Sequence, residues 1–473
     1  MFLRMIYDDK LAQAAYLIGC QRTGEAIVID PERDVDRYID LAAAQGLTVV
    51  AVAETHIHAD FLSGAREMAE QVGAKVFVSG EGGPDWSYRW LDQKQGGGIY
   101  DHVALKHGDR FSIGNIGFQA LHTPGHTPEH VAYLVTDHGS GADEPIGMIS
   151  GDFVFVGDVG RPDLLETATG QTGAMEPSAR TLCESVRTLD DIADYVQLWP
   201  GHGAGSACGK ALGAVPTSTI GYERRFNPAI KAASDQARFV DFILEGQPEP
   251  PLYFATMKRD NRDGPAVLGG IPTPDRVGID VLSTVDPSKV AIVDTRPWPE
   301  FRSGHLPGSL SFPLINSFCT DVGSMVGGDE DIYLVVDAER LDEVVRDLIR
   351  IGLDRIKGWC PPEEISSAAT ATIQEIEVAD AIASVESGKF SVLDVRRATE
   401  FAGGHVPGAV NASHTRLASR VDDVPGPGPI LVNCRSGARS ARSCAYLQRL
   451  GYDVTNLAGG FLAWDASGAK VDR

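Results

Sequence analysis

The first half of the chain alternates short apolar runs with polar turns that carry Gly or Pro. Helix-like segments such as residues 62–73 lie between these runs. Strands that alternate with helices predict a layered α/β domain. Histidines or aspartates stand at the strand ends, where a rigid scaffold can aim them at one point. The apolar runs and the loops that end them occupy residues 25–31, 47–56, 118–126, 147–155 and 194–203.

The second half contains an internal repeat with a spacing of 394 − 294 = 100 residues. Eight identities in fifteen positions are hard to obtain by chance, so we predict two copies of one α/β unit. The first copy carries Asp294, Arg296, Glu300, Phe301, Gly304, His305, Pro307 and Gly308, which recur as Asp394, Arg396, Glu400, Phe401, Gly404, His405, Pro407 and Gly408.

Residues 245–275 are rich in Pro and Gly, which predicts a domain boundary within them. A chain of 473 residues is too long for one ordinary domain. We therefore expect three domains, at residues 1–262, 275–365 and 372–473.

Charge and cysteine content narrow the class of protein. The 65 acidic and 42 basic side chains give a net charge of −23, which argues against binding to nucleic acid or to an anionic membrane. No apolar run reaches the roughly 18 residues of a membrane helix. Seven scattered cysteines fit a reducing compartment better than a disulfide framework. We expect a cytoplasmic homo-oligomer.

Residues 55–61 read T-H-I-H-A-D-F and come close to the metal motif H-x-H-x-D-H. The last position of that motif is Phe61, which has no lone pair to offer a metal. Further histidines and an aspartate follow in "HTPGHTPEH" at 122–130, "SGDFVFVGDVGRPDL" at 150–164 and "WPGHG" at 199–203.

Together these motifs resemble the metallo-β-lactamase superfamily, which implies an αββα sandwich. In the two-metal hydrolases of that superfamily, three histidines make one site. The second site takes the aspartate and the last histidine of H-x-H-x-D-H, together with the histidine of the motif nearest the C-terminus of the domain. Another aspartate bridges the two metals. Here the second site would need Asp60, position 61 and His202, so Phe61 cripples it.

The persulfide dioxygenases are a narrower family that keeps one metal. Resemblance to them implies that His56, His126 and Asp152 bind one iron(II) per chain, with positions open for dioxygen and a substrate sulfur. Zinc stays open as the alternative, because a catalytic zinc site also uses three protein ligands.

Other residues near these motifs are expected to support the centre. His58, Asp60 and His202 would orient the ligands or hydrogen-bond the substrate. Arg161 lies on the loop after the metal aspartate. It would clamp a carboxylate or phosphate of the thiol substrate, or else form a structural salt bridge.

Two cysteines are candidates to accept sulfane sulfur. Resemblance to proteins that join a persulfide dioxygenase to sulfurtransferase domains implies this role, because such cysteines can accept sulfane sulfur there. Cys208 follows closely after His202, which would place it beside the metal. Cys20 ends an early strand and would face the same cleft. The alternative for both is a small buried thiol.

Each copy of the repeat resembles a rhodanese domain, a sulfurtransferase fold. In the C-terminal copy a cysteine heads a six-residue loop. Backbone N–H groups at a helix start and two guanidinium groups would stabilise its thiolate and an anionic persulfide. In the middle copy Asp337 aligns with that cysteine, so we predict an inactive domain that packs or places the active ones. The loop consists of Cys434, Arg435, Ser436, Gly437, Ala438 and Arg439.

These resemblances imply an enzyme of sulfide and persulfide detoxification. Its dioxygenase domain would oxidise a low-molecular-weight thiol persulfide to sulfite with dioxygen, and Cys434 would transfer sulfane sulfur to sulfite to give thiosulfate. Two alternatives stay open. One is a zinc hydrolase of glutathione thioesters with an accessory sulfurtransferase, and the other is a sulfur carrier or sensor without catalysis.

Overall fold

The computed structural model describes residues 1–168, 170–210 and 212–473. The chain divides into two compact units, Met1–Ile271 with Ile349–Gly352 and Pro272–Leu348 with Leu353–Arg473. The change near residue 271 falls within the Pro- and Gly-rich stretch. The division of the second unit at 275–365 and 372–473 stays a prediction. Among the helices of the described residues, none combines the length and apolar character needed to span a membrane.

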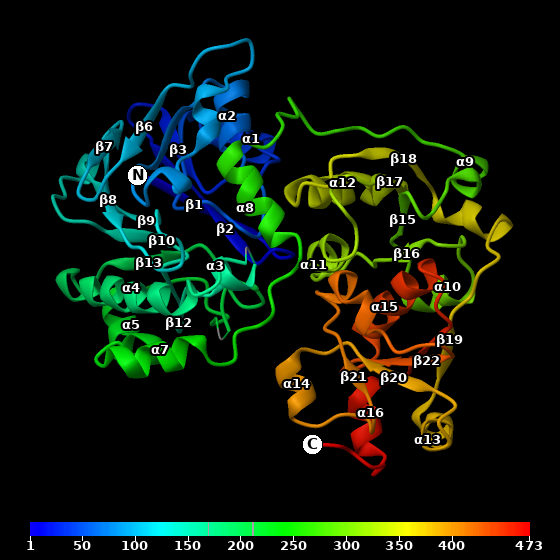
Figure 1. Ribbon diagram of the computed structural model, residues 1–473. Coiled ribbons are helices and arrows are strands. Elements are labelled where there is room, and N and C mark those ends of the chain that lie inside the picture. Colours follow the sequence, from blue (N-terminus) through cyan, green and yellow to red (C-terminus); the bar gives the residue numbers. More distant parts are fainter. Residues whose placement is uncertain (169, 211) are drawn as a thin grey trace. The chain divides into compact units, whose positions relative to one another are not determined.

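Two six-stranded sheets form the first unit (Figure 1). One sheet has the order β1 (Phe2–Asp8), β2 (Gln13–Cys20), β3 (Glu25–Ile29), β4 (Thr48–Ala53), β5 (Lys75–Ser79) and β6 (His102–Leu105). The other has the order β14 (Ser218–Thr219), β13 (Gln197–Pro200), β10 (Gly147–Gly151), β9 (Val131–Asp137), β8 (Ile116–His122) and β7 (Arg110–Ile113). A small ribbon pairs β11 (Val154–Phe155) with β12 (Asp158–Val159).

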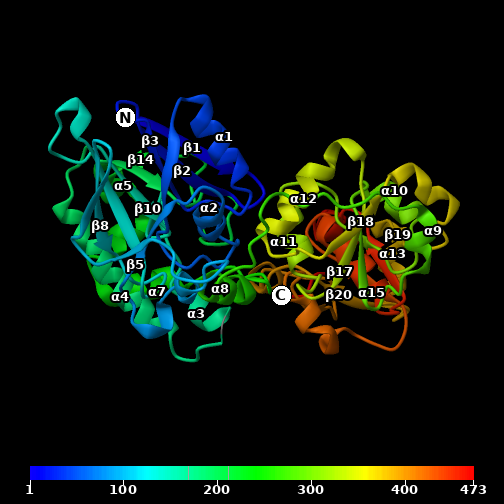
Figure 2. The ribbon, with the colours of Figure 1, turned by 90° about the horizontal axis from the view of Figure 1, so that it is seen from above.

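Helices cover the outer face of each sheet. Against the first sheet lie α1 (Asp36–Ala44), which contacts β4 and β2, and α2 (Ala65–Gln71), which contacts β4 and β5; Figure 2 shows α1 next to β2. The remaining helices of the unit are α3 (Leu164–Thr167), α4 (Met175–Arg187), α5 (Ile220–Phe226), α6 (Pro228–Ala232), α7 (Gln236–Leu244) and α8 (Phe254–Asp263).

Strand alternation builds this layering. Along β2, Ala15 and Leu17 belong to the core that includes residues of α1 and α2, whereas Tyr16 and Ile18 belong to the core between the sheets. Successive strand residues point to opposite faces, so one buried strand serves two cores. A third core joins the second sheet to α4 and α7. The predicted αββα sandwich is thus confirmed.

The Pro- and Gly-rich stretch 245–275 contains more than a linker. It includes α8, a helix of ten residues with Phe254 and Met257 buried. Its short apolar pattern is flanked by proline-rich segments, which concealed the helix in the sequence.

The second unit holds two parallel sheets. The first has the order β16 (Leu310–Ser311), β15 (Val290–Asp294), β17 (Asp331–Val335) and β18 (Ile356–Cys360). The second has the order β19 (Gln374–Ile376), β23 (Val454–Leu457), β22 (Ile430–Asn433), β20 (Ser391–Asp394) and β21 (Val410–Asn411). The helices are α9 (Ile279–Thr284), α10 (Trp298–Ser303), α11 (Phe318–Gly323), α12 (Leu341–Arg350), α13 (Val378–Glu386), α14 (Ala398–Ala402), α15 (Ala438–Arg449) and α16 (Gly460–Ala466).

The repeated residues make the same contacts in both copies. Arg296 binds the carboxylate of Asp294 and donates to the carbonyl of Gly304 at 3.0 Å. Arg396 repeats this with Asp394 and with the carbonyl of Gly404 at 2.7 Å. We call this arrangement the Asp–Arg lock. It ties the end of β15 in one copy, and of β20 in the other, to the start of the G-H-x-P-G turn.

Candidate metal centre and cysteine loop

Four polar side chains that follow strands meet at one edge of the two sheets. His56 follows β4, whereas His126, Asp152 and His202 follow β8, β10 and β13. β8 and β10 are both antiparallel to β9, and β10 is parallel to β13, so the three strands run in one direction. Their carboxyl ends therefore lie at the same edge. All four side chains are buried, with no more than 3% of each residue exposed.

Each of the three histidines is held through its Nδ1 atom. A carbonyl oxygen can only accept, so Nδ1 of His126 and of His202 donates and the Nε2 lone pair is left for the site. The partners are Thr55 Oγ1 for His56 at 3.0 Å, the Arg161 carbonyl for His126 at 2.9 Å and the Ala12 carbonyl for His202 at 2.9 Å.

The first candidate metal group is His56, His126 and Asp152, whose ligand atoms all lie within 4.8 Å of one another. Burial lowers the pKa of both histidines well below its ordinary value, so they are neutral donors. Burial also raises the pKa of Asp152 to about 6. A divalent cation would offset the cost of ionising this buried carboxyl. Two imidazoles and one carboxylate fit iron(II) or zinc.

A second candidate metal group adjoins the first. It consists of Asp60, His202 and Cys208. Asp152 lies between the groups: its Oδ2 is 3.4 Å from Nε2 of His126, and its Oδ1 is 3.4 Å from Nε2 of His202. The sequence placed Cys208 beside the metal residues, and the structure brings it there.

A buried acid cluster holds His58. Its Nε2 is 3.1 Å from Oδ1 of Asp30 and 3.1 Å from Oε2 of Glu54. Burial alone would lower the pKa of His58, but the two carboxylates outweigh it and raise the pKa well above its ordinary value. The ring of Phe61 lies 4.4 Å from that of His58 and is fully buried. Phe61 thus packs against the second histidine of the motif.

The backbone around this edge is unusually tight. Ala12 and Asp30 have φ of 50° and 52°, a region that few non-glycine residues occupy and that is common near functional sites. A Cβ atom on Gly160 would lie 1.8 Å from the carbonyl oxygen of Asp152. A Cβ atom on Gly201 would lie 2.9 Å from Asp152 Oδ1. Side chains at either position would displace the aspartate.

Arg161 does not have the substrate-binding position expected from the sequence. Its guanidinium donates to both carboxylate oxygens of Asp163, at 2.8 and 2.6 Å, and to the carbonyl of Ala207 at 2.8 Å. The residue is 0% exposed. The structural salt bridge is therefore the correct interpretation. Arg161 contributes to the centre through its carbonyl group, which orients His126.

Cys20 does not face the metal groups, contrary to expectation. Gln13, at the start of β2, forms a β-bridge with His202, whereas Cys20 ends the same strand seven residues later. Seven residues of strand span roughly 23 Å. The Cys20 thiol instead accepts hydrogen bonds from Asn115. Burial would raise its pKa, but hydrogen bonds from Asn115 and Thr23 outweigh burial and lower the pKa to about 6.

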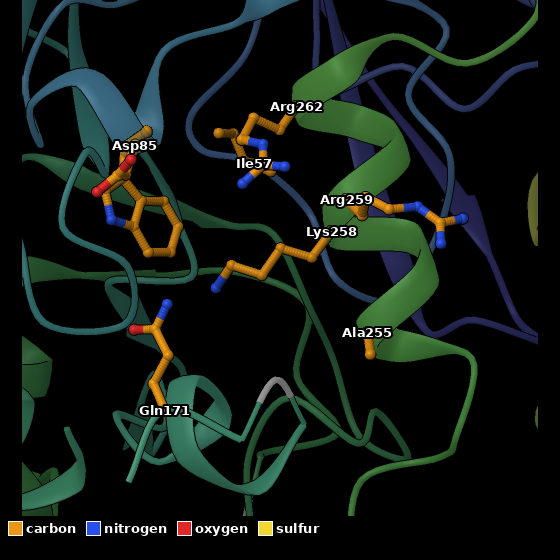
Figure 3. A pocket seen from close by; sticks show the side chains of 8 residues that line it. Ile57, Asp85, Gln171, Ala255, Lys258, Arg259 and Arg262 are labelled. Carbon is orange, nitrogen blue, oxygen red and sulfur yellow. The ribbon is translucent and has the colours of Figure 1, made fainter. Parts of the chain in front are cut away.

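A cavity of about 440 Å³ is lined in part by Ile57, the residue after the metal candidate His56, and was missed in the sequence (Figure 3). Lys258 extends into it from α8, and its Nζ lies 4.2 Å from the centre of the Trp86 ring. Lys258 is only 8% exposed, and in the described part of the chain its Nζ has no hydrogen-bond acceptor. Burial lowers its pKa to about 8, although Glu129 opposes the shift. Lys258 and Arg262 are four residues apart, so a helix would place them on one face. This spacing was the sequence signal that could have revealed the cavity.

The Cys434 loop joins β22 to α15, as the sequence predicts. The Cys434 thiol accepts from the N–H of Gly437 at 3.2 Å and from the Ser440 hydroxyl at 3.5 Å. Gly437 has φ of 95° and precedes the first turn of the helix. Arg439 forms a double hydrogen bond with Glu400, 2.8 Å on each side. Glu400 was visible in the sequence only as a repeated residue.

Strand register corrects the alignment of the middle copy. Asp294 pairs with Val335, and Asp394 pairs with Asn433. The residue after each partner is Val336 in one copy and Cys434 in the other, so Val336 and not Asp337 occupies the cysteine position. A one-residue offset in an ungapped alignment caused the error. A valine carries no sulfur either, and the predicted lack of a reactive thiol at this position stands.

Comparison with known proteins identifies the domain that carries the metal groups and the domain that carries Cys434. A model of the metallo-β-lactamase superfamily matches residues 8–202, and one of the rhodanese-like domain matches residues 377–467. A solved metallo-β-lactamase from Staphylococcus aureus subsp. aureus COL is 39% identical, with a TM-score of 0.68. The match covers 76% of this chain and 99% of that one.

Two curated relatives carry different activities in their names. Persulfide dioxygenase ETHE1 of Bos taurus is 23% identical over 50% of this chain and 78% of its own length. Hydroxyacylglutathione hydrolase GloC of Haemophilus influenzae is 27% identical over 44% of this chain and 89% of its own length. The chain spans only 62% and 54% of the length of two β-lactamase hydrolase-like proteins that it also matches. The chain belongs to the metallo-β-lactamase superfamily and carries a C-terminal rhodanese-like domain.

Proposed function

We propose that this protein is a non-heme iron persulfide dioxygenase coupled to a sulfurtransferase that acts on persulfides and sulfite. The observation that carries the proposal is the pairing of one His–His–Asp group with one cysteine that heads a helix-starting loop. His56, His126 and Asp152 would hold the metal. Iron(II) bound there supplies electrons and open positions for dioxygen and a substrate sulfur.

The overall oxidation balances as R–S–SH + O₂ + H₂O giving R–SH, SO₃²⁻ and two protons. The chain's own residues would orient the metal ligands and the histidine next to them. Thr55 and the Arg161 carbonyl fix the two imidazoles, and the buried acid cluster fixes His58. Pre-set ligands of this kind do not need to reorganise when a substrate binds.

The cavity beside the centre indicates the chemical class of the thiol. A buried ammonium without an acceptor favours an anion, and hydrogen bonds to charged groups contribute about 1.5–3 kcal/mol. Lys258 would bind a carboxylate or phosphate of the thiol carrier while the persulfide reaches the metal edge near Ile57. Glutathione and coenzyme A both satisfy this requirement.

The transfer step would use the thiolate of Cys434. Its Sγ attacks the outer sulfur of a second persulfide, forms Cys–S–SH and releases the thiol. Sulfite then attacks the outer sulfur of the enzyme persulfide, giving thiosulfate and restoring the thiolate. The Gly437 N–H and the Ser440 hydroxyl, which donate to Sγ, would stabilise the anionic forms.

A zinc-dependent thioester hydrolase is the second candidate, favoured by the likeness to the Haemophilus influenzae hydrolase. One experiment separates the two. The protein is purified without oxygen, its metals are quantified, and oxygen uptake with glutathione persulfide is compared with hydrolysis of a glutathione thioester. We expect the purified protein to contain iron and to consume oxygen with glutathione persulfide. Zinc with thioester turnover and no oxygen uptake would establish the hydrolase.

Matched variants link the activity to the metal group. His126→Ala should lose both iron and oxygen uptake, because one of three ligands is gone. His122→Ala is the control, since its Nε2 lies 2.8 Å from the Pro128 carbonyl and away from the metal group. A His126→Ala protein with full iron occupancy would refute the assigned ligands.

A further inference from the structure

The two copies of the repeat differ in two side chains of α10 that reach a single acceptor. Trp298 and Arg302 both align with alanines in the second copy. The indole N–H of Trp298 donates to Oε2 of Glu375 at 2.7 Å, and Nε of Arg302 lies 3.5 Å from its Oε1. Glu375 lies on β19, an edge strand of the second copy's sheet. The first copy therefore contacts this sheet through side chains that the second copy lacks at the matching positions.

Glu375 connects α10 to the next strand of the sheet. It pairs with Asn456 of β23, and its Oε2 also accepts from Nδ2 of Asn456 at 2.8 Å. The same Nδ2 donates to the carbonyl oxygen of Gly437 at 3.3 Å. A carboxylate and a carbonyl can only accept, so the amide of Asn456 must present its nitrogen to both. Asn456 is 1% exposed, and its Oδ1 has no donor in the described part of the chain. The two acceptors therefore determine which way this buried amide points.

Gly437 brings an N–H group to the thiol of the Cys434 loop. Its N–H donates to Sγ of Cys434 at 3.2 Å, while its carbonyl accepts from Asn456. Gly437 has φ of 95°, and a glycine can rotate about its backbone bonds more freely than other residues. The contact on the carbonyl restricts the rotation that would turn the N–H away from Sγ. Four hydrogen bonds thus connect the indole of Trp298 to the thiol.

We propose that Trp298, Glu375 and Asn456 form a relay through which the first copy positions the Gly437 N–H against the Cys434 sulfur. All of these residues belong to the second compact unit. They act through Gly437 and are positioning residues. An N–H group stabilises a thiolate or a persulfide anion only when it is aimed at the charge, so the relay controls how well the loop holds the anionic sulfur.

The relay gives the first copy a role in the chemistry of the second. Glu400 and Arg439 hold the arginine end of the Cys434 loop from within the second copy, whereas the relay reaches the glycine end from α10. The inference rests on the proposed sulfur transfer at Cys434 and does not depend on the dioxygenase. The rival explanation is that these contacts only hold the two copies together. Stability would then change in the variants, but the ionisation of Cys434 would not.

The ultraviolet absorbance of the Cys434 thiolate tests the relay without turnover. The full-length protein is titrated with pH in the absence of oxygen, and the signal is the difference from the same protein carrying Cys434→Ser. Trp298→Phe removes the indole N–H and keeps an aromatic ring. We expect it to move the midpoint of the thiolate absorbance upward by roughly half a pH unit, and Asn456→Leu to move it by roughly one unit.

Glu375→Leu separates the relay from a simple charge effect. Removing a nearby negative charge would by itself favour the thiolate and lower the midpoint. Loss of the relay should instead raise the midpoint by roughly one pH unit. Glu375→Gln keeps an acceptor oxygen for Trp298 and Asn456, so its midpoint should stay below that of Glu375→Leu. This conservative variant also guards against a folding defect.

Trp464→Phe is the matched control. It removes an indole N–H of the same unit that donates to the Lys470 carbonyl at 2.9 Å and takes no part in the relay. Its midpoint should equal that of the parent protein. The proposal would be overturned if Trp298→Phe moved the midpoint no further than Trp464→Phe, or if Glu375→Leu left it unchanged or lowered it. The expected shifts without thiosulfate formation would refute the proposed transfer and leave the relay standing, whereas normal transfer with unmoved midpoints would refute the relay alone.

Discussion

Asp321 offers a direct test of what the copy without a thiol at the cysteine position does for the copy that carries Cys434. It lies on α11 of the first repeat, and its Oδ2 is 2.6 Å from Nε of Arg442 on α15 of the second. The residues are 1% and 5% exposed. Oδ1 of Asp321 also lies 3.5 Å from Nε2 of His414. Asp321→Ala leaves the guanidinium of Arg442 buried without this partner, so the substitution should be strongly destabilising.

The expected cost follows from burial. Removing one partner of a buried ion pair destabilises a protein by about 3–5 kcal/mol, whereas exposed pairs contribute about 0–1 kcal/mol. Arg276→Ala is the matched control, since Arg276 pairs with Glu364 at the same 2.6 Å but its side chain is 60% exposed. Asp321→Leu with Arg442→Met removes both charges and should recover much of the loss, because apolar replacement of a buried pair is often tolerated.

Denaturant unfolding of the full chain, followed at the buried Trp464, gives the free energies. α15 begins at the Cys434 loop, so thiosulfate:cyanide sulfurtransferase activity should fall with stability in Asp321→Ala and return in the double variant. The reasoning would be refuted if Asp321→Ala cost no more than Arg276→Ala. The first copy would then not hold α15 through this pair.

The other predictions concern the two units separately. Cys434→Ser should leave oxygen uptake intact and shift the product from thiosulfate to sulfite, because a serine cannot form a persulfide; mainly enzymatic thiosulfate in product chromatography would contradict this. Adding Val336→Cys to that variant should not restore thiosulfate:cyanide activity, since the 3₁₀ turn after Val336 lacks the glycine-led loop. Burial would raise the pKa of Glu400, but Arg439 lowers it to about 2. Its stabilisation is therefore full only above the ordinary pKa of 4.5 and is lost as the pH falls towards 2; Arg439→Ala should flatten acid unfolding over that range, and an unchanged profile would argue against it. Lys258→Met should lower kcat/KM for glutathione persulfide by roughly 10- to 100-fold through KM, which steady-state oxygen uptake would measure; an unchanged KM would exclude the cavity as the carrier site.

Local chemistry made part of this architecture predictable. In the sequence, a change from an apolar run to a polar loop with Gly or Pro marks the strand ends that carry the metal candidates. The sheets bring these ends together, and they carry His56, His126, Asp152 and His202. The Cys434 loop was also visible, because a cysteine after an apolar strand, followed by a glycine and arginines, predicts a loop that can stabilise a thiolate.

Features that depend on tertiary packing could not be predicted from the sequence. Arg161 and Lys258 are both basic residues near the centre, yet one is neutralised by Asp163 and the other has a cavity before it. Only the fold determines which of the two basic residues is free to bind a ligand. Cys20 and Cys208 have similar local sequence patterns, but the fold places only Cys208 beside the metal group. The offset between Val336 and Asp337 appears only when strands are paired through their hydrogen bonds.

The Asp–Arg lock bears on how such repeats should be recognised. Both copies keep the aspartate, the arginine and the glycine carbonyl that they clamp, although only one copy has a thiol at the end of its central strand. The motif therefore serves the fold of each copy, whether or not a thiol follows the neighbouring strand. A genome survey keyed to D-x-R and G-H-x-P-G would count two sulfurtransferases here. A reliable survey must ask which residue follows the strand beside the lock.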